Sequence, residues 1–404
     1  MTIQLLSPAS DSPQWAKIRD PNKKLPPAII LGGNDNALSI VRSLGRRGIP
    51  VHVLNKPDSD VAHSYYARPI TLASDQPFEE AAIQFLRGSP SEFLRGSVLL
   101  AASDEALTLI ADNRQQLAER FRLDLSNREA QRRMLDKLTT YHIAEQADVP
   151  TPKFWEVQSK ADLFSVQSEL VFPVIIKPVH SHLFQQKFRS KFLIAENFQE
   201  LCEAFRIVEA AKIEIFLVEK IPGPDSALCS YYTYLDEQGS PLFDFTKRII
   251  RRFPVNMGLA TYHVTDHVDG VKEPALRLFQ HAGLRGLANA EFKYDRRDGK
   301  LKLIECNARF TAANGLVTRA GIDLGSLVYN RIVGLPLPPL DHFKAGLTLW
   351  DPLRDLKALG ELRTRGEITF FQWARSVMRL QQFPSFAWSD PKPAIARLVR
   401  RFRS

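Results

Sequence analysis

The sequence predicts a mixed α/β and α+β protein built from more than one domain. Near the N-terminus, an apolar run at Ala28–Leu31 precedes a glycine-containing turn and apolar residues at helical spacing, which is typical of a βαβ unit. Near residue 300, two runs of alternating polarity flank a turn at Arg296–Gly299, which is typical of an antiparallel hairpin. The chain has 404 residues, 44% of them hydrophobic, and this length allows two or three domains with substantial cores.

The overall composition argues against several classes of protein. No apolar run approaches the roughly 20 residues of a membrane-spanning helix, and residues 1–27 lack the apolar stretch of a signal peptide. Cys202, Cys229 and Cys306 have neither disulfide nor metal-ligand spacing, which predicts reduced thiols in a cytoplasmic protein. The net charge of +9 is compatible with anionic ligands or membrane surfaces. No nucleic-acid-binding motif accompanies it, so no nucleic-acid partner is expected.

The first α/β unit is predicted from residue 28 onward. After the turn at Gly32–Asn36, a helix is expected from the spacing of Leu38, Val41 and Leu44, and Val51–Leu54 is the next strand. Because the turn lacks the pattern G-x-G-x-x-G, a dinucleotide site is not predicted there.

Two acidic residues follow a further predicted strand, Val98–Ala102. Asp104 and Glu105, at the carboxyl end of that strand, could face a ligand crevice. Capping of the next helix by Ser103 or Asp104 is the favoured explanation.

Two lysines are candidate ligands for an anion. Lys177 ends the apolar strand Val174–Lys177, where burial of an ammonium group is costly unless an anion meets it. The alternative is that its side chain reaches solvent. Lys137 lies on a charged helix predicted over residues 128–147, and by itself this lysine suggests only a solvated side chain.

A more specific pattern is a strand that ends at Glu219 and runs into a Pro-Gly-Pro turn, with Asp225 just beyond. Extended backbone at Lys220 and Ile221 could offer an amide and a carbonyl to a purine edge. Glu219 could accept a hydrogen bond from the purine amino group, and Asp225 from ribose hydroxyls. Taken alone, the segment is also compatible with an ordinary turn.

The hairpin near residue 300 gives the most informative pattern. Glu305 and Asn307 are two residues apart on a strand, so they point to the same face. A three-residue loop at Arg297–Gly299 sets Glu291 opposite Glu305, whereas a two-residue Asp-Gly loop turns Glu291 to the other face. In the first register, Glu291, Glu305 and Asn307 form an all-oxygen cluster that suits Mg²⁺ or Mn²⁺. The alternative is a hairpin with an exposed acidic face.

Taken in order, these features resemble the ATP-grasp superfamily, over about residues 28–335. The motifs are Lys137, the Ile-Lys-Pro strand end at Lys177, Glu-Lys-Ile-Pro-Gly from Glu219 with Asp225, and Glu291 with Glu305-Cys-Asn-Ala-Arg309. The subgroup suggested is the carboxylate–amine ligases related to D-aspartate ligase. The resemblance implies an ATP-grasp fold with an N-terminal Rossmann-like (pre-ATP-grasp) domain. The expected segments are an N-terminal extension (1–27), the pre-ATP-grasp domain (28–126), the lid or small subdomain (127–212), the metal-binding subdomain (213–339) and a basic helical C-terminal extension (340–404).

The resemblance also implies roles for the candidate residues. Lys137 and Lys177 would contact the ATP phosphates and the adenine side. Glu219, Lys220 and Ile221 would hold adenine, and Asp225 the ribose. Glu291, Glu305 and Asn307 would bind two Mg²⁺ (or Mn²⁺) ions, and Arg309 would stabilise the acyl phosphate or its carboxylate.

One departure concerns the loop after Pro178. Many superfamily members have a glycine-rich loop there that covers the phosphates, but residues 178–192 contain no glycine. The loop offers polar and basic side chains instead: His180, Ser181, His182, Lys187, Arg189 and Lys191. These could clamp phosphates by charge. Weakened catalysis and an exposed basic hairpin are the alternatives.

The resemblance predicts an enzyme that joins a small-molecule carboxylate to an amine through an acyl phosphate, giving an amide or peptide-like C–N bond. The alternatives are an ATP-grasp kinase and a regulatory or membrane-associated ATP-binding protein with little or no catalysis. Strand alternation places Arg248 and Arg252 on one face, either for a substrate carboxylate or in solvent. His263 and His267 are expected at the surface.

The C-terminal region has a different composition. From Leu340 onward it contains 12 Lys or Arg against 6 Asp or Glu. A final helix after Asp390 groups Ile395, Leu398 and Val399 on one face, with arginines over much of the remainder. This helix could rest on an anionic membrane surface at the cytoplasmic side. Docking on the protein itself, or on a second subunit of a homodimer, is favoured because only about three helical turns are available.

Overall fold

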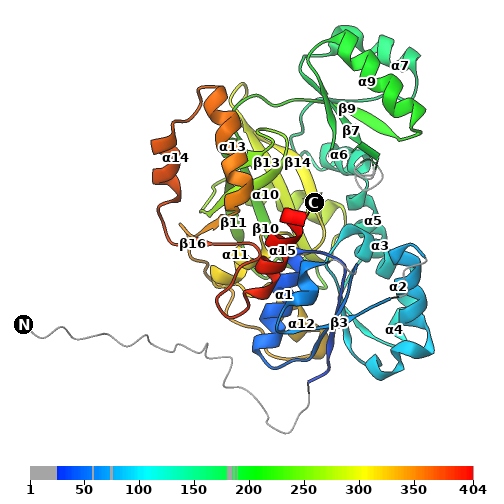
Figure 1. Ribbon diagram of the computed structural model, residues 1–404. Coiled ribbons are helices and arrows are strands. Elements are labelled where there is room, and N and C mark those ends of the chain that lie inside the picture. The colour runs from blue at the N-terminus through cyan, green and yellow to red at the C-terminus, as the bar shows by residue number, and fades with distance from the viewer. Residues whose placement is uncertain are drawn as a thin grey trace, which may run out of the picture.

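The computed structural model describes residues 25–56, 59–72, 76–179, 184, 187–188 and 190–403. Within these residues the strands form three sheets, each in its own region of the molecule (Figure 1). A parallel sheet lies at the bottom of this view, a small antiparallel sheet at the upper right, and a larger sheet between them. The predicted combination of α/β and α+β architecture is confirmed.

The N-terminal sheet is parallel throughout, in the order β3-β2-β1-β4-β5. Its strands are β1 (Ala28–Leu31), β2 (Val51–Leu54), β3 (Ala67–Ile70), β4 (Val98–Ala101) and β5 (Arg122–Leu123). The helices that connect and cover them are α1 (Asp35–Arg46), α2 (Phe78–Arg87), α3 (Asp104–Asp112) and α4 (Arg114–Ala118). Strands β1 and β2 are buried along almost their whole length, as expected for a parallel sheet that is covered on both faces. The predicted βαβ start is therefore confirmed.

The small sheet has the order β6-β9-β7-β8 and packs against α7 (Lys160–Ser165) and α9 (Phe198–Ala210). Its strands are β6 (Phe154–Glu156), β7 (Val174–Pro178), β8 (Leu193–Ala195) and β9 (Ile215–Glu219). Strand β9 pairs with both β6 and β7. The predicted boundary between residues 212 and 213 therefore cuts this sheet, because a β-strand joins partners that are distant in sequence.

The large sheet has the order β14-β13-β10-β11-β12-β15-β16. Its strands are β10 (Leu228–Leu235), β11 (Phe245–Phe253), β12 (Leu259–Thr265), β13 (Gly286–Asp295), β14 (Lys300–Asn307), β15 (Thr348–Trp350) and β16 (Gln381–Gln382). One face packs against α10 (Lys272–His281) and the helices that precede the small sheet, in a core that contains Met134 and Phe279. Part of the opposite face packs against the N-terminal domain through Tyr232, Tyr234 and Leu287, and another part lines the candidate site.

The predicted helix over 128–147 is two helices, α5 (Arg128–Leu135) and α6 (Lys137–Gln146). Asp136 lies between them in an extended conformation, and its side chain accepts a hydrogen bond from the Thr139 amide. Asp136 thus ends one helix and caps the next, an effect that apolar periodicity alone does not reveal. As a consequence, Lys137 occupies the first turn of α6.

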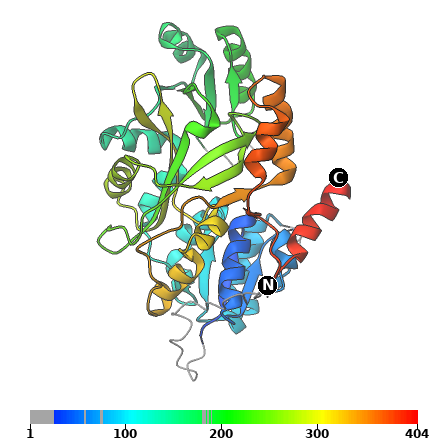
Figure 2. The same cartoon turned by 90° about the vertical axis from the view of Figure 1, so that its left-hand side faces the viewer.

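The chain after residue 310 returns to the other domains. Helices α11 (Asn314–Arg319) and α12 (Leu324–Val333) pack on α1 of the N-terminal domain. Strands β15 and β16 extend the large sheet, and α13 (Pro352–Thr364) packs on β11 and β12. Helix α14 (Phe370–Val377) follows, and α15 (Lys392–Arg403) lies beside α1 (Figures 1 and 2). The C-terminal region is therefore helical, as predicted, and it also completes the large sheet.

Candidate nucleotide and metal site

A cavity of about 310 Å³ is lined by residues of both the small sheet and the large sheet. All of the candidate site residues line it except Asp225 and Arg248. The ten that do are Lys137, Lys177, Glu219, Lys220, Ile221, Arg252, Glu291, Glu305, Asn307 and Arg309. The fold therefore brings together residues from five strands, one helix and the loops that follow β9 and β14.

The β13–β14 hairpin places Glu291 opposite Glu305, as predicted, but by a different route. Asp295 pairs with Lys300, so the turn has four residues, Arg296–Gly299, and not three. With that turn and regular pairing, Glu291 would lie opposite Ile304 and not opposite Glu305. A β-bulge at Ile304, between the pairs Phe292–Leu303 and Glu291–Glu305, adds one residue and restores the pairing.

The three candidate metal ligands share one edge of the large sheet. Asn307 follows Glu305 by two residues and pairs with Asn289 across the strands, so the oxygen atoms of Glu291, Glu305 and Asn307 project from one face. Carboxylate and carboxamide oxygens are the donors that Mg²⁺ and Mn²⁺ prefer, and the set therefore fits either ion. No cluster of three His, Cys, Asp or Glu side chains with metal-binding geometry occurs among the described residues. This set depends on an asparagine as its third ligand.

Glu305 lies in a strongly positive environment. The Lys137 ammonium is 3.3 Å from Glu305 Oε1. Burial acts to raise the pKa of Glu305, but the charges of surrounding cations outweigh burial and hold the pKa well below its ordinary value. In order of effect, those cations are Lys137, Lys191, Lys177 and Arg309. Glu305 is therefore ionised, and the cations beside it can also meet an anionic ligand.

Lys177 is buried at the end of β7, and its Nζ donates hydrogen bonds to the Ile304 carbonyl (2.8 Å) and the Tyr141 hydroxyl (3.2 Å). The Ile304 carbonyl belongs to the bulge, so the irregularity in β14 also supplies an acceptor for this lysine. Burial, and secondarily the charge of Lys137, lower the pKa of Lys177 to about 7. An anion at Lys177 would restore the ammonium form.

The proposed adenine segment is held by side chains that the sequence did not indicate. Lys293 Nζ donates to the carbonyls of Ile221 (2.9 Å) and Gly223 (2.8 Å). Glu219 forms an ion pair of 2.5 Å with Arg297, from the hairpin turn. The segment is therefore fastened to β13 and to its turn.

Asp225 and Arg252 bind each other. Arg252 Nε is 2.7 Å from Asp225 Oδ1, and the amides of Arg252 and Asn256 donate to Asp225 Oδ2. Asp225 is buried and does not line the cavity, whereas Arg252 does. The structure thus uses Asp225 to hold Arg252.

The prediction that Arg248 and Arg252 share a face is wrong. Strand β11 has a bulge at Ile250, and a second register shift follows between Arg251 and Arg252. These irregularities bring Arg252 to the cavity, while Arg248 lies on the opposite face and pairs with Asp266 at 2.6 Å. Regular alternation cannot be assumed across a bulge.

Lys247 is the cavity residue that the sequence analysis missed on β11. Its side chain is buried, only 3% exposed, and it makes no hydrogen bond or ion pair with any described residue. Burial lowers its pKa, and the nearby charge of Glu291 partly opposes this effect. A buried lysine without a partner is costly, which indicates that an anion completes its environment. The sequence feature that could have indicated Lys247 is its position one residue before Arg248, in a strand rich in basic residues.

His263 was expected at the surface, but it lines the cavity across the strand pair from Ile249. Its Nδ1 atom is buried without a hydrogen-bond partner in the described part of the chain. Burial, together with the charge of Lys247, holds the pKa of His263 well below its usual range, so the ring is neutral. His267 is exposed, as predicted, and stacks on Phe343.

Two basic residues of the glycine-free loop belong to the described part of the chain. Lys191 lines the cavity and Lys187 is exposed. The predictions for His180, Ser181, His182 and Arg189 fall outside the described residues.

The sequence is similar to curated carboxylate–amine ligases. It is 26% identical to a D-aspartate ligase of Enterococcus faecium over 322 residues, which cover 74% of this chain and 75% of that protein. It is 25% identical to a D-alanine–D-alanine ligase of Pseudomonas fluorescens over 188 residues, 43% of this chain and 53% of that one. No family model matches the sequence.

Solved structures share the fold. An N5-carboxyaminoimidazole ribonucleotide synthetase in complex with ADP aligns with a TM-score of 0.62 and 16% identity, over 80% of this chain and 81% of that chain. The chain has the ATP-grasp fold. An L-amino acid ligase from Bacillus licheniformis aligns with a TM-score of 0.59 and 21% identity, over 77% of this chain and 75% of that chain. The predicted resemblance to ATP-grasp carboxylate–amine ligases is confirmed.

Proposed function

We propose that this ATP-grasp protein uses ATP to join a carboxylate to an amine. The observation that most supports the proposal is the cavity in which Glu291, Glu305 and Asn307 face a group of lysines. Transfer of a phosphoryl group to a carboxylate brings anions together, so a catalyst for it needs positive charge and oxygen ligands for a metal more than a covalent nucleophile. The similarity to ligases that form C–N bonds agrees with this chemistry.

In the proposed reaction, a carboxylate oxygen bonds to the γ-phosphorus of ATP as the bond to the β-phosphate oxygen breaks, and ADP leaves. The amine nitrogen then bonds to the acyl carbon, phosphate leaves, and the amine loses a proton. Lys137, Lys177 and Lys247 would neutralise the phosphates. Arg309 would stabilise the acyl phosphate, and Arg252, held by Asp225, would contact another anionic group.

Glu291, Glu305 and Asn307 would hold Mg²⁺ or Mn²⁺, which supplies charge neutralisation at the transferring phosphoryl group when bound. Glu219, Lys220 and Ile221 would contact adenine, since their segment lines the cavity and is fixed by Lys293 and Arg297. Asp225 would act by holding Arg252 and not by contacting the ribose, because it is buried beside Arg252 and does not line the cavity. Arg248 would not contact the ligands, because it lies on the opposite face of β11 and pairs with Asp266.

The test is an assay of ATP turnover with Mg²⁺ and a panel of D- and L-amino acids and uronic acids, each with and without amines. We expect ADP and free phosphate to appear only when a carboxylate and an amine are both present, together with a product whose mass is their sum less one water. Phosphate retained on an acceptor would indicate a kinase. Nucleotide binding without turnover on any pair would indicate a regulatory protein, and either result would contradict the proposal.

We also propose that the C-terminal region contacts an anionic membrane surface, on the strength of how α15 docks. Arg397 forms ion pairs with Asp35 (2.5 Å) and Asp60 (2.6 Å), so the helix meets the N-terminal domain through its basic side. Its apolar residues Ile395, Leu398 and Val399 remain 43–56% exposed. Docking is thus observed, but it leaves the apolar face uncovered.

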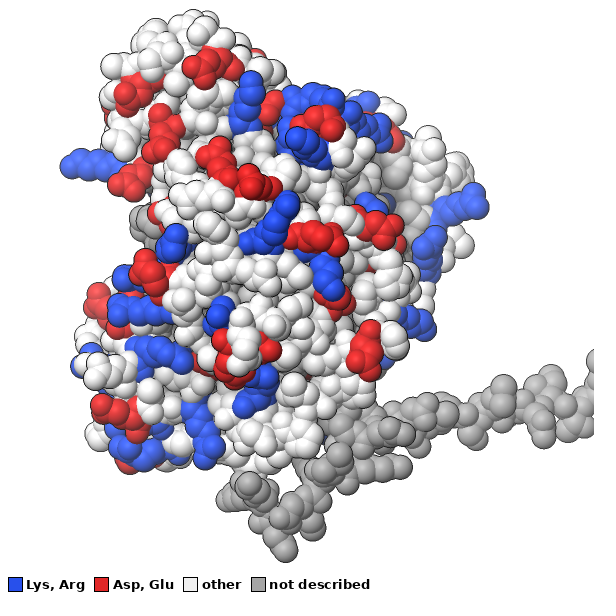
Figure 3. Space-filling model, turned by 180° about the vertical axis from the view of Figure 1, so that it is seen from behind, with Lys and Arg blue, Asp and Glu red and all other residues white. Residues whose placement is uncertain are grey.

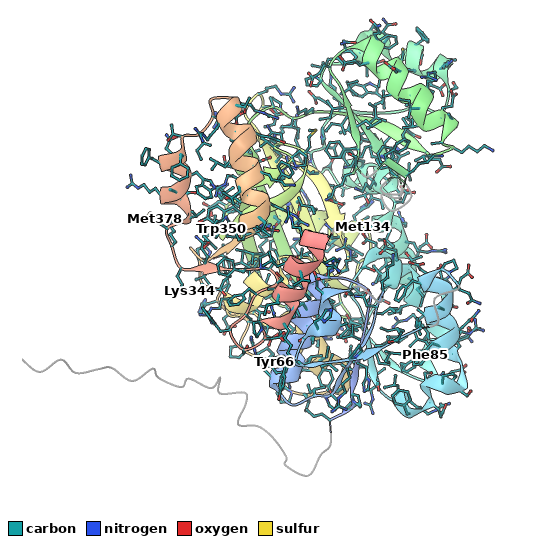
Figure 4. All side chains as sticks on the ribbon, in the orientation of Figure 1. Tyr66, Phe85, Met134, Lys344, Trp350 and Met378 are labelled. Carbon is teal, nitrogen blue, oxygen red and sulfur yellow. The ribbon has the colours of Figure 1, made fainter. Side chains whose placement is uncertain are left out.

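Other apolar side chains in this region are also exposed. Trp388 is 91% and Leu380 85% exposed, and Met378 points away from the molecule at its left edge (Figure 4). The same region contains 12 Lys or Arg against 6 Asp or Glu. Exposed apolar groups beside basic ones suit an anionic bilayer surface. On the face seen in Figure 3, by contrast, positive and negative side chains are mixed. No described helix is both long and apolar enough to cross a bilayer.

Vesicles of phosphatidylcholine with and without phosphatidylglycerol test this contact by co-sedimentation. We expect binding to the anionic vesicles that falls at least about fivefold in the variant Trp388→Ser/Leu398→Ser. Binding that is equal for both vesicle types, or unaffected by the substitutions, would overturn the membrane proposal. A concentration-dependent dimer lost in the same variant would assign this surface to a homodimer instead.

A further inference from the structure

We infer that Asp104, in the N-terminal domain, is the residue that positions Arg309 in the cavity. The inference rests on the proposed function, because Arg309 matters for catalysis only if the cavity handles a phosphoryl or acyl phosphate group. It assigns a part in the chemistry to the N-terminal domain, which among its described residues contributes only Asp35 to the lining of the cavity.

The contact between the two residues is bidentate and connects two domains. Asp104 is the first residue of α3 and follows β4 by three residues, and Arg309 follows β14 by two residues. Arg309 Nη2 is 2.8 Å from Asp104 Oδ2, and Arg309 Nε donates to Asp104 Oδ1. Such fork-like pairs fix the plane of the guanidinium group as well as its position.

Helix capping does not explain Asp104. Ser103 is the cap, since its Oγ accepts a hydrogen bond from the Ala106 amide at 3.2 Å. Among the described residues, Arg309 has no other carboxylate within ion-pair distance. The pairing is therefore what Asp104 contributes at this place.

Neighbouring contacts strengthen the attachment of this segment to the N-terminal domain. Arg309 Nη1 donates to the Phe310 carbonyl at 3.1 Å, and that carbonyl also accepts a hydrogen bond of 3.3 Å from Nδ2 of Asn36, in the first turn of α1. On the other side, the Tyr232 hydroxyl donates to the Arg309 carbonyl at 2.9 Å. The segment of Arg309 and Phe310 is thus held from both domains.

The hydrogen-bond count shows what remains for a ligand. A guanidinium group has five N–H donors. Asp104 and Phe310 accept from Nε, Nη2 and Nη1, which leaves one N–H on each of the two terminal nitrogens. Because Arg309 lines the cavity, these remaining donors are available to an oxyanion there. Without Asp104 the guanidinium could rotate and approach Glu305, whose charge already acts on it.

A double-mutant cycle with Asp104→Asn and Arg309→Gln tests this coupling in the full-length protein. We expect Asp104→Asn to lower kcat by about 10- to 100-fold with less than about a twofold change in KM for ATP, and to have little further effect once Arg309 is Gln. Asp104→Glu should recover part of the lost kcat. The control is Glu105→Gln, since Glu105 is exposed in the same helical turn and has no polar partner among the described residues; it should behave as wild type.

If the two substitutions lowered kcat independently, so that their effects multiplied in the double variant, the inference would be overturned. An equal loss of kcat in Glu105→Gln would also overturn it. A second readout does not depend on turnover. In ¹⁵N NMR spectra, the Arg309 Nε–H signal, assigned with Arg309→Lys, should be protected from exchange in wild type and lost in Asp104→Asn. A signal that persists in Asp104→Asn would contradict the inference even if no substrate pair were found, whereas loss of the signal without any ligase turnover would reject only the proposed function.

Discussion

Strands β14 and β11 both border the cavity and both contain a β-bulge, yet the bulges have opposite consequences for prediction. In β14, the extra residue Ile304 cancels the shift caused by a four-residue turn, so Glu291 faces Glu305 as expected. In β11, the irregularity at Ile250 ends the regular alternation, so Arg252 reaches the cavity and Arg248 does not. Agreement between prediction and structure in β14 is therefore a product of two compensating departures.

The comparison shows that spacing within a strand is reliable only between irregularities. Glu305 and Asn307 lie on the same side of the bulge, and their common face follows from alternation alone. Lys247 and Ile249 likewise precede the bulge in β11, and both line the cavity. Relations that cross a bulge or a turn, such as Glu291 with Glu305 or Arg248 with Arg252, need the structure.

The largest expected effect is on β14. Glu305→Gln removes the charge of a metal ligand while keeping its shape, so we expect kcat to fall by at least about 1,000-fold. ADP release under saturating ATP and Mg²⁺ measures it. The control is Glu129→Gln, at an exposed position of α5 with no polar partner among the described residues. Wild-type turnover in Glu305→Gln would show that the hairpin is not the metal-binding end of the site.

The two faces of β11 can be compared directly. Lys247→Met keeps most of the side-chain volume but removes the buried ammonium, and we expect kcat/KM for ATP to fall by about 100-fold. Arg248→Met changes the neighbouring residue on the opposite face, and we expect less than about a twofold change. Steady-state kinetics on both variants measure the difference. A larger loss in Arg248→Met than in Lys247→Met would indicate that Arg248, and not Lys247, contacts the substrates.

A smaller effect is expected in the number of protons that Lys177 takes up when a nucleotide binds. In the free protein, burial lowers the pKa of Lys177 from 10.5 to about 7, and a bound phosphate favours the ammonium form. Above about pH 7, nucleotide binding should therefore take up a proton, approaching one equivalent near pH 8.5, and well below pH 7 the uptake should vanish. Calorimetric titration with an ATP analogue in buffers of different ionisation enthalpy measures the uptake.

The same shift has a stability consequence with a definite sign. Between about pH 7 and pH 10.5, the unfolded chain binds more protons at Lys177 than the folded one, so this residue makes the free protein more stable as pH rises through that window. Lys177→Met should abolish both dependences. Proton uptake unchanged in that variant would assign it to another group.

The smallest expected change lies at the base of the adenine segment. Lys293→Met removes the donor to the Ile221 and Gly223 carbonyls without touching any group proposed to contact the phosphates. We expect KM for ATP to rise by about 3- to 10-fold with kcat nearly unchanged. A fall in kcat with KM unaltered would mean that Lys293 acts on the reacting groups.

Much of the fold could be predicted from local pattern. Apolar runs and helical periodicity gave the βαβ start, and the order of short motifs gave the ATP-grasp fold. Apolar periodicity could not reveal the break at Asp136, because a capping side chain interrupts the helix without changing the pattern around it. Pairing between distant strands, as for β9, also leaves little trace in local sequence.

Most of the site was predicted because its members occur in recognisable short motifs. Lys247 and His263 were missed because their significance depends on burial, which only the packed sheet creates. For Asp104, helix capping was the favoured interpretation for a related reason: an acidic residue at a helix start is commonly a cap, and the ion pair with the distant Arg309 exists only in the folded chain. The composition of the C-terminal region also did not show that its final helix docks through arginines and not through its apolar face.

We propose above all that the bulge at Ile304 places Glu291 and Glu305 where both can bind the same metal ion. It is tested most directly by titrating Mn²⁺ in the presence of a non-hydrolysable ATP analogue and following free Mn²⁺ by electron paramagnetic resonance. We expect Glu291→Gln and Glu305→Gln each to weaken Mn²⁺ binding by at least about 10-fold, while Glu129→Gln leaves it unchanged. Undiminished Mn²⁺ affinity in Glu291→Gln, with Glu305→Gln impaired, would contradict the claim and place Glu291 outside the metal site.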